Sequence, residues 1–199
     1  MIKKLSYIFG SKTHAQEILF LLHDAKEVVR QGFYAEELPK IEKFCRDFNL
    51  IIVKSKFKVL LADAEAYSNK GIRVPEDDIR EGMYFVYISK SEQKACLASY
   101  YELISNDRDL GILLGFPCCC VDFFCQKFTV NKQNLELPST NPFTNLSKRA
   151  QDLVILSHFP CRSDCQDSIN LAKRYLDVLM KVDSRRVEEL LKALKDSAN

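Results

Sequence analysis

Two short segments in the second half of the chain carry six of its eight cysteines. The first runs Gly115-Phe-Pro-Cys-Cys-Cys-Val-Asp-Phe-Phe-Cys125, and the second runs His158-Phe-Pro-Cys-Arg-Ser-Asp-Cys165. Thiols gathered in this way constrain the fold, because a shared site requires the chain to bring two distant segments together. The rest of the sequence bears on whether such a site holds a disulfide, a metal ion or an iron–sulfur cluster.

The expected cellular compartment follows from the lack of long apolar runs. None reaches the roughly 18 residues that a membrane-spanning helix needs. The longest, Ile18–Leu22, stops at His23, and the apolar part of the stretch from Met1 to Gly10 is too short for a signal peptide. We therefore expect a cytoplasmic protein without a membrane partner. In a reducing compartment, clustered cysteines indicate metal, cluster or thiol chemistry more often than structural disulfides.

Both cysteine segments carry signals for the start of a helix. Pro117 is favoured at the first position of a helix, so Cys118–Cys120 are expected in its first turn. Ser163 begins a capping-box pattern, which predicts Cys165 in the first turn of a second helix and Cys161 in the loop before it. Backbone N–H groups and the positive end of the helix dipole favour a thiolate at such positions.

Cys119, Cys120, Cys161 and Cys165 together offer four thiolates. Consecutive helical residues point about 100° apart, so adjacent cysteines can reach one ion only near a helix end or an irregular turn. Four thiolates suit Zn²⁺ or a four-iron cluster, and the sequence leaves that choice open. His158 lies three residues before Cys161 and offers a nitrogen ligand, so a zinc site with mixed cysteine and histidine ligands is an alternative.

Three other cysteines are interpreted as part of the core. Cys45 and Cys96 stand alone on the apolar faces of expected helices, and Cys125 stands beside Phe124. Unpaired cysteines are among the most buried residue types and act as small apolar fillers. We therefore leave these three out of the predicted site.

The cysteine segments and their surroundings resemble a known family. The run from Leu110 to Phe124, the tripeptide Asn141-Pro-Phe143 and the run from His158 to Ser168 are similar to a largely archaeal prokaryotic family catalogued as domain of unknown function four-eight-three. The resemblance covers roughly residues 84–180. Its pattern falls on the following residues: Gly115, Pro117, Cys119, Cys120, His158, Pro160, Cys161 and Cys165. The resemblance implies the four-cysteine ligand set, with Cys118 at a variable position, and it implies no reaction.

The periodicity of apolar residues predicts an α+β fold. With 199 residues, the chain fits a single domain, 1–199, with a possible subdivision into 1–105 and 106–199. Strands are predicted at Leu50–Val53, Phe57–Leu61 and Met83–Ile88. Helices are predicted at Thr13–Gly32, Leu38–Phe48, Ser91–Ile104, Asp107–Gly115, Pro117–Phe128, Pro142–Ser157, Asp164–Met180 and Asp183–Lys195. A small N-terminal sheet with helices is thus followed by a mainly helical half that carries the cysteines.

Charge and motif content narrow the function classes. Lys and Arg number 29 against 27 for Asp and Glu, and this balance argues against a large nucleic-acid interface. The chain has no phosphate-binding glycine loop and no dinucleotide fingerprint. We therefore expect the binding partner to be a small molecule or a protein, and the sequence does not identify it. Three functions stay open: a metal- or cluster-binding protein, an enzyme using a cluster or zinc in sulfur or thiol chemistry, and a metal-free dithiol redox protein.

Overall fold

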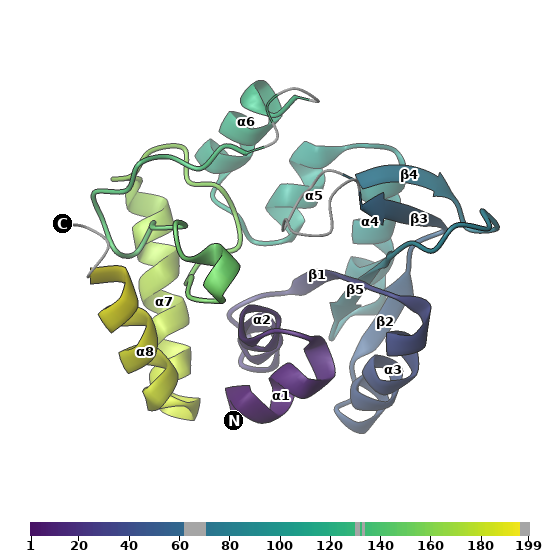
Figure 1. The fold of residues 1–199 in the computed structure, drawn as a ribbon, viewed down its shortest axis with the longest axis horizontal. Helices are drawn as coiled ribbons and strands as arrows, with labels where there is room; N and C mark the ends of the chain where they lie inside the picture. The colour runs from purple at the N-terminus through teal and green to yellow at the C-terminus, as the bar shows by residue number, and fades with distance from the viewer. Residues whose placement is uncertain (62–70, 130–131, 133, 196–199) are drawn as a thin grey trace. The chain divides into compact units, whose positions relative to one another are not determined.

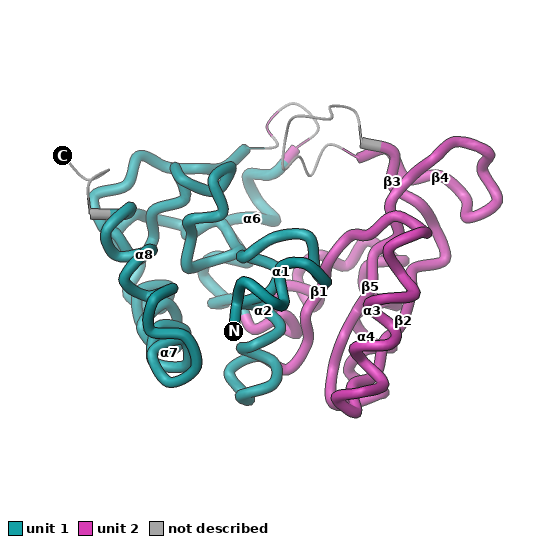
Figure 2. Tube along the Cα trace, turned by 60° about the horizontal axis from the view of Figure 1, so that its bottom comes forward, with its two compact units in different colours: residues 1–26, 116–128, 134–199 teal, residues 27–115, 129–133 magenta. Residues whose placement is uncertain are grey.

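The computed structural model of the chain describes residues 1–61, 71–129, 132 and 134–195, and these form a mixed α+β fold, as the sequence predicts (Figure 1). The chain divides into two compact units (Figure 2). Unit 1 comprises residues 1–26, 116–128 and 134–199, and unit 2 comprises residues 27–115 and 129–133. The units therefore do not follow the subdivision at residues 105 and 106 that the sequence allows.

Unit 2 is built on an antiparallel sheet in the order β1 (Val28–Phe33), β5 (Tyr84–Ser89), β2 (Ile51–Lys54). The central strand β5 supplies the buried residues Val86, Tyr87 and Ile88. A hairpin of β3 (Phe57–Leu61) and β4 (Gly71–Pro75) pairs separately. The remaining elements of this unit are η1 (Ala35–Glu37), α3 (Leu38–Asp47), α4 (Glu92–Leu103) and α5 (Asp107–Leu113).

A buried carboxylate ties the elements of unit 2 together. Glu102 of α4 is 3% exposed and accepts hydrogen bonds from Arg30 of β1 and Arg73 of β4, with Arg73 Nη2 at 2.8 Å from its Oε1. The two guanidinium groups compensate the cost of burying the carboxylate. This network links the sheet, the hairpin and α4.

Unit 1 is helical. It contains α1 (Ile2–Phe9), α2 (Lys12–Leu22), α6 (Cys118–Lys127), η2 (Arg149–Gln151), α7 (Gln166–Val182) and α8 (Ser184–Lys195). Helix α7 packs on both α2 and α8, and α7 and α8 lie side by side in Figure 1. Phe20 of α2 stacks on Tyr175 of α7 with ring centroids 4.0 Å apart, at the centre of this helical core.

The long irregular segment before α7 is anchored to the helices by side chains. The Asp152 carboxylate accepts hydrogen bonds from the backbone N–H groups of Lys12, at 2.8 Å, and Thr13, at 3.3 Å, and so caps the start of α2. Gln16 of α2 donates to the carbonyl of Val154 at 2.8 Å. These bonds hold the segment that leads to the second cysteine pair.

The structure corrects two of the predicted helices. The helix predicted over Thr13–Gly32 ends at Leu22, and Val28–Phe33 is strand β1 because it pairs with β5 along its whole length. The helix predicted over Pro142–Ser157 is replaced by turns and the short helix η2. Asn141 and Asn145 explain the turns, since each side chain accepts a hydrogen bond from the backbone two residues later.

Two further differences concern segments for which no helix or strand was predicted. Helix α1 is one of them, although its buried residues Ile2, Leu5 and Phe9 follow helical spacing. The other is strand β4, which lies between the predicted strands Phe57–Leu61 and Met83–Ile88; residues 62–70 lie outside the described residues. In the described part of the chain, no helix has the length and apolar character needed to cross a membrane.

Candidate metal centre

Two helix starts in unit 1 present the cysteine segments. Helix α6 begins at Cys118 with Pro117 as its N-cap, so Cys118–Cys120 form its first turn, as predicted. Helix α7 begins at Gln166, and its N-cap is Cys165 itself rather than the predicted Ser163. An N-cap residue lies beside the first backbone N–H groups of the helix, which have no acceptor within the helix. Both helix starts therefore offer thiols next to backbone donors.

The four predicted cysteine ligands come together. The sulfur atoms of Cys119, Cys120, Cys161 and Cys165 all lie within 4.8 Å of one another, which is within metal-binding distance. The Sγ of Cys165 lies 3.7 Å from that of Cys119 and 3.7 Å from that of Cys120, and the last two are 3.9 Å apart. Around a tetrahedral Zn²⁺ with Zn–S bonds of about 2.3 Å, sulfurs lie roughly 3.8 Å apart. Three of the four sulfurs therefore already have this spacing.

Hydrogen-bond donors surround the buried side of this thiol group. The backbone N–H of Cys161 donates to Cys120 Sγ at 3.3 Å, and the Ser168 hydroxyl oxygen lies 3.2 Å from the same sulfur. Although burial acts to raise it, the pKa of Cys165 is lowered to about 7 by hydrogen bonding that includes the backbone N–H of Ser168. A thiolate at Cys165 is thus accessible at neutral pH.

Two other thiols of the group, those of Cys119 and Cys120, resist ionisation. Burial raises the pKa of Cys120 to about 12, and burial together with the hydrogen bond to Cys165 raises the pKa of Cys119. Neighbouring thiolates repel one another at these separations. A cation among the sulfurs would favour the ionised forms of Cys119 and Cys120, as a metal–thiolate site requires.

His158 contacts the sulfur group only indirectly, through Ser168. Its ring is 6% exposed, packs on Phe116 with centroids 5.1 Å apart, and has Nε2 at 2.9 Å from the hydroxyl oxygen of Ser168. Burial, together with the positive charges of Lys26 and Arg149, lowers its pKa to about 3. The ring is therefore neutral. His158 is not a member of the group of converging ligand atoms, and it reaches Cys120 through Ser168.

Ser168 is the site residue that sequence reasoning missed. It is fully buried and touches both Cys120 and His158. A detectable signal was its position three residues after Cys165, because residues at this spacing share one face of a helix.

The remaining cysteines differ in exposure. Cys45 is fully buried in α3, as predicted. Cys96 and Cys125 are exposed, which corrects their interpretation as core. In α4 the neighbouring position Ala95 faces the interior, and a step of one residue turns about 100° away from it. Cys118 is also exposed and lies outside the converging group.

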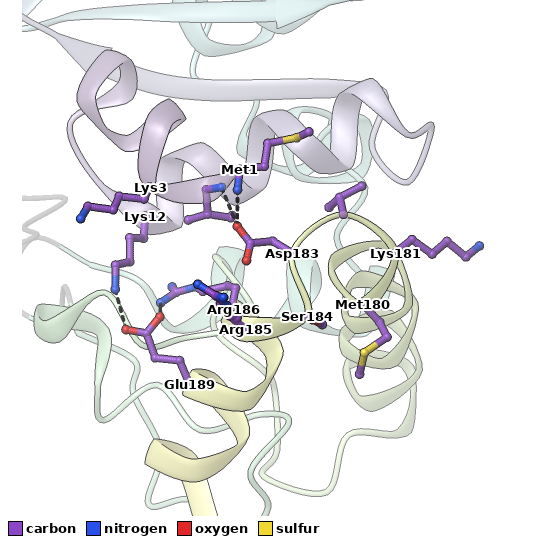
Figure 3. Close-up of a pocket in the computed structure, with 12 residues that line it drawn as sticks. Met1, Lys3, Lys12, Met180, Lys181, Asp183, Ser184, Arg185, Arg186 and Glu189 are labelled. Carbon is purple, nitrogen blue, oxygen red and sulfur yellow. Dashed lines mark hydrogen bonds and ion pairs between the residues drawn. The ribbon is translucent and has the colours of Figure 1, made fainter.

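A second candidate location is a hollow of about 680 Å³ in unit 1, lined by the start of α1 and the turn between α7 and α8 (Figure 3). Its central charges are paired within the protein. Lys12 and Arg186 both bond Glu189, and Asp183 accepts the backbone N–H of Ile2 at 2.8 Å. These contacts explain the charged lining as internal ion pairing, so the hollow adds no candidate site.

Comparison with known proteins does not extend this description. A scan against protein-family models found no match, and searches among curated proteins and among solved structures found none either.

Proposed function

We propose that this chain is a metal-binding protein of the cytoplasm, in which Cys119, Cys120, Cys161 and Cys165 hold a single tetrahedral ion, and that the ion is Zn²⁺. The observation that carries the proposal is the spacing of the sulfurs, three of which lie 3.7–3.9 Å apart. This spacing agrees with the roughly 3.8 Å edge of a tetrahedral zinc–thiolate site. The family pattern that the two segments resemble supports the same four ligands.

The compactness of the group favours one ion over an iron–sulfur cluster. In a four-iron cluster each cysteine binds a different iron, so the ligand sulfurs stand outside a cube of metal and sulfide. That arrangement requires more room than a group whose sulfurs all lie within 4.8 Å of one another. A mononuclear site needs no displacement of α6 relative to the N-cap of α7.

Four thiolate ligands also favour a structural role for the ion. A catalytic zinc site has three protein ligands and keeps its fourth position for water or substrate. Here the protein supplies all four donors. The ion would join the start of α6 to the segment that precedes α7, and its binding free energy would contribute to the folding of unit 1.

A dithiol redox protein is the second candidate, because Cys165 lies 3.7 Å from two other thiols. Formation of a disulfide would require the two sulfurs to approach to about 2.05 Å, with suitable dihedral angles. Neither Cys119 nor Cys120 is favoured by the distances as the partner of Cys165. A metal ion, by contrast, uses all of these contacts at once.

Metal analysis of anaerobically purified protein tests the proposal. We expect about one equivalent of zinc, a colourless protein, and a Co²⁺-substituted form with the visible absorption of a tetrahedral thiolate site. A brown protein that contains iron and sulfide would show that the site holds an iron–sulfur cluster and not zinc. Protein with less than about a tenth of an equivalent of any transition metal, and with no capacity for reconstitution, would overturn metal binding and support the redox alternative.

A further inference from the structure

A chain of buried groups leads away from the proposed metal site. Ser168, in the first turn of α7, has its hydroxyl oxygen 3.2 Å from Cys120 Sγ and 2.9 Å from His158 Nε2. Ser168 is 0%, Cys120 2% and His158 6% exposed. Water therefore does not compete for these two hydrogen bonds, and their directions depend on the few hydrogens that the three groups possess.

The hydrogens can be counted. A hydroxyl has one hydrogen, and a neutral imidazole has one N–H and one bare nitrogen. The ring of His158 is neutral because burial, together with the positive charges of Lys26 and Arg149, lowers its pKa. Its Nδ1 has no hydrogen-bond partner among the residues that the structure describes. The direction of the chain is therefore set at its other end, by the state of Cys120.

Two directions satisfy the chain. A metal-bound thiolate can only accept, so Ser168 donates to Cys120 Sγ, His158 donates from Nε2 to Ser168, and Nδ1 is bare. When Cys120 is a thiol, its S–H donates to the Ser168 oxygen, Ser168 donates to Nε2, and the ring hydrogen is on Nδ1.

We propose that His158 is a positioning residue for the metal site, acting through Ser168, and that its imidazole changes from the Nδ1–H to the Nε2–H tautomer when the metal binds. This inference rests on the proposed metal-binding function. The proton balance is simple: Cys120 loses its thiol hydrogen, the neutral ring keeps one hydrogen but on the other nitrogen, and one proton leaves to solvent.

The packing around His158 suits this role. Phe116 lies against the imidazole, with ring centroids 5.1 Å apart, and restricts its rotation. On the Phe116 ring lies the ammonium of Lys26, at 5.0 Å from the centroid, and this ammonium is neutralised by Glu17 in a buried ion pair. The contact with Phe116 therefore holds the imidazole in place, and it leaves either ring nitrogen able to carry the single hydrogen.

Nitrogen NMR of histidine-labelled protein, with and without Zn²⁺, tests the change of tautomer. We expect the signals of His158 to change from the Nδ1–H pattern in metal-free protein to the Nε2–H pattern in the zinc-bound form. The chain has three histidines, so His14 and His23 serve as internal controls. His14 should keep its hydrogen on Nδ1 in both forms, because that atom lies 3.0 Å from the carbonyl oxygen of Phe9.

Variants of Ser168 and His158 distinguish a hydrogen-bonding role of these residues from simple packing. In Ser168→Ala, zinc affinity should fall about tenfold, the scale typical of groups that support ligands, and the tautomer of His158 should no longer respond to zinc. His158→Gln, whose amide can still donate to Ser168, should retain more affinity than His158→Ala. Equal affinities in these two variants would overturn the hydrogen-bonding role.

The failure of this inference can be told apart from failure of the proposed function. If the wild-type protein binds zinc but His158 has the same tautomer in both forms, the relay is wrong and metal binding stands. If the wild-type protein binds no metal, both are wrong.

Discussion

Three adjacent cysteines, Cys118, Cys119 and Cys120, show how much one residue of helical rotation matters. Cys118 and Cys119 are exposed, whereas Cys120 is 2% exposed. Successive positions point about 100° apart, so three neighbours cannot all face one ion. The placement of these cysteines at the helix end lets two of them contribute, and leaves Cys118 pointing elsewhere.

Single serine substitutions should separate ligands from bystanders. Cys118→Ser is expected to keep wild-type zinc affinity and serves as the matched control. Each substitution of Cys119, Cys120, Cys161 or Cys165 removes a ligand, so affinity should fall by more than the roughly 10–100-fold that supporting groups contribute. Competition with a chelator measures the effect. Zinc loss from Cys118→Ser with retention in Cys119→Ser would contradict the assignment.

Metal affinity should depend steeply on pH. The pKa of Cys120 is raised to about 12 by burial, and burial also raises the pKa of Cys119, so both hold protons at neutral pH. Zinc must displace these protons, and each one released makes the apparent affinity rise about tenfold per pH unit. Between pH 7.5 and 8.5, chelator competition should show an increase of about a hundredfold. An affinity independent of pH would show that the thiols are already ionised.

Cys45 and Cys96 test whether burial, rather than residue type, determines the cost of substitution. Cys45→Ala should lower the free energy of unfolding by on the order of 1 kcal/mol, since the side chain is fully buried. Cys96→Ala, at an exposed position of α4, should change it by less than about 0.5 kcal/mol. Both should keep their zinc. The sequence predicted the first environment and not the second, because Ala, Cys and Leu follow one another in α4 and leave its apolar face ambiguous.

Helix α2 shows that an element can be capped by a distant part of the chain. The Asp152 carboxylate bonds the N–H groups of Lys12 and Thr13, and Ser11 supplies the local cap by accepting from His14. Asp152 has a positive φ of 63°, a conformation that Asn tolerates better than Ala. Both the charge and the backbone of Asp152 therefore contribute to the stability of this helix start.

Substitution of Asp152 should destabilise unit 1. Asp152→Ala is expected to lower the free energy of unfolding by about 1 kcal/mol, the usual cost of a lost cap, and Asp152→Asn by less. Burial acts to raise the pKa of Asp152, but the hydrogen bonds from Thr13 and Lys12 outweigh it and lower the pKa. The contribution of the carboxylate is thus present above its unfolded pKa of about 3.9 and is lost as pH falls through the lower folded value. Denaturation curves at pH 7 and pH 3 should show the difference between wild type and Asp152→Ala shrinking in acid.

Elements with strong local signals could be predicted from the sequence, and elements defined by distant partners could not. Helix α6 and strand β3 follow from Pro117 and from the β-branched and bulky residues of Phe57–Leu61. Val28 and Val29 fit a helix equally well by pattern. They form a strand because Ser89 and Ile88 of β5 pair with them, far along the chain. The convergence of the cysteine segments was predicted from their helix starts, whereas the contacts of Ser168 with Cys120 and His158 depend on tertiary structure that the sequence pattern does not give.

At the scale of the whole molecule, the proposed metal site belongs to unit 1 alone. Its ligands lie on α6 and on the segment that ends at the N-cap of α7, and the sheet of unit 2 contributes none of them. Removal of zinc with a chelator should therefore increase amide hydrogen exchange at the starts of α6 and α7 and leave β1, β5 and β2 unchanged. Equal increases in both units would show that the metal site stabilises the molecule as a whole.

The bond pattern at Cys120 and Cys161, which are 41 positions apart, has a topological consequence. A metal ion held by both residues would turn the intervening polypeptide into a closed ring. By analogy with a disulfide of that loop length, closure would restrict the unfolded chain by about 4 kcal/mol. A protease that cut the backbone once within this ring would produce two fragments that the bound ion still joins. A chelator that removed the ion would leave only noncovalent packing, such as that of α7 on α2, to hold the fragments together.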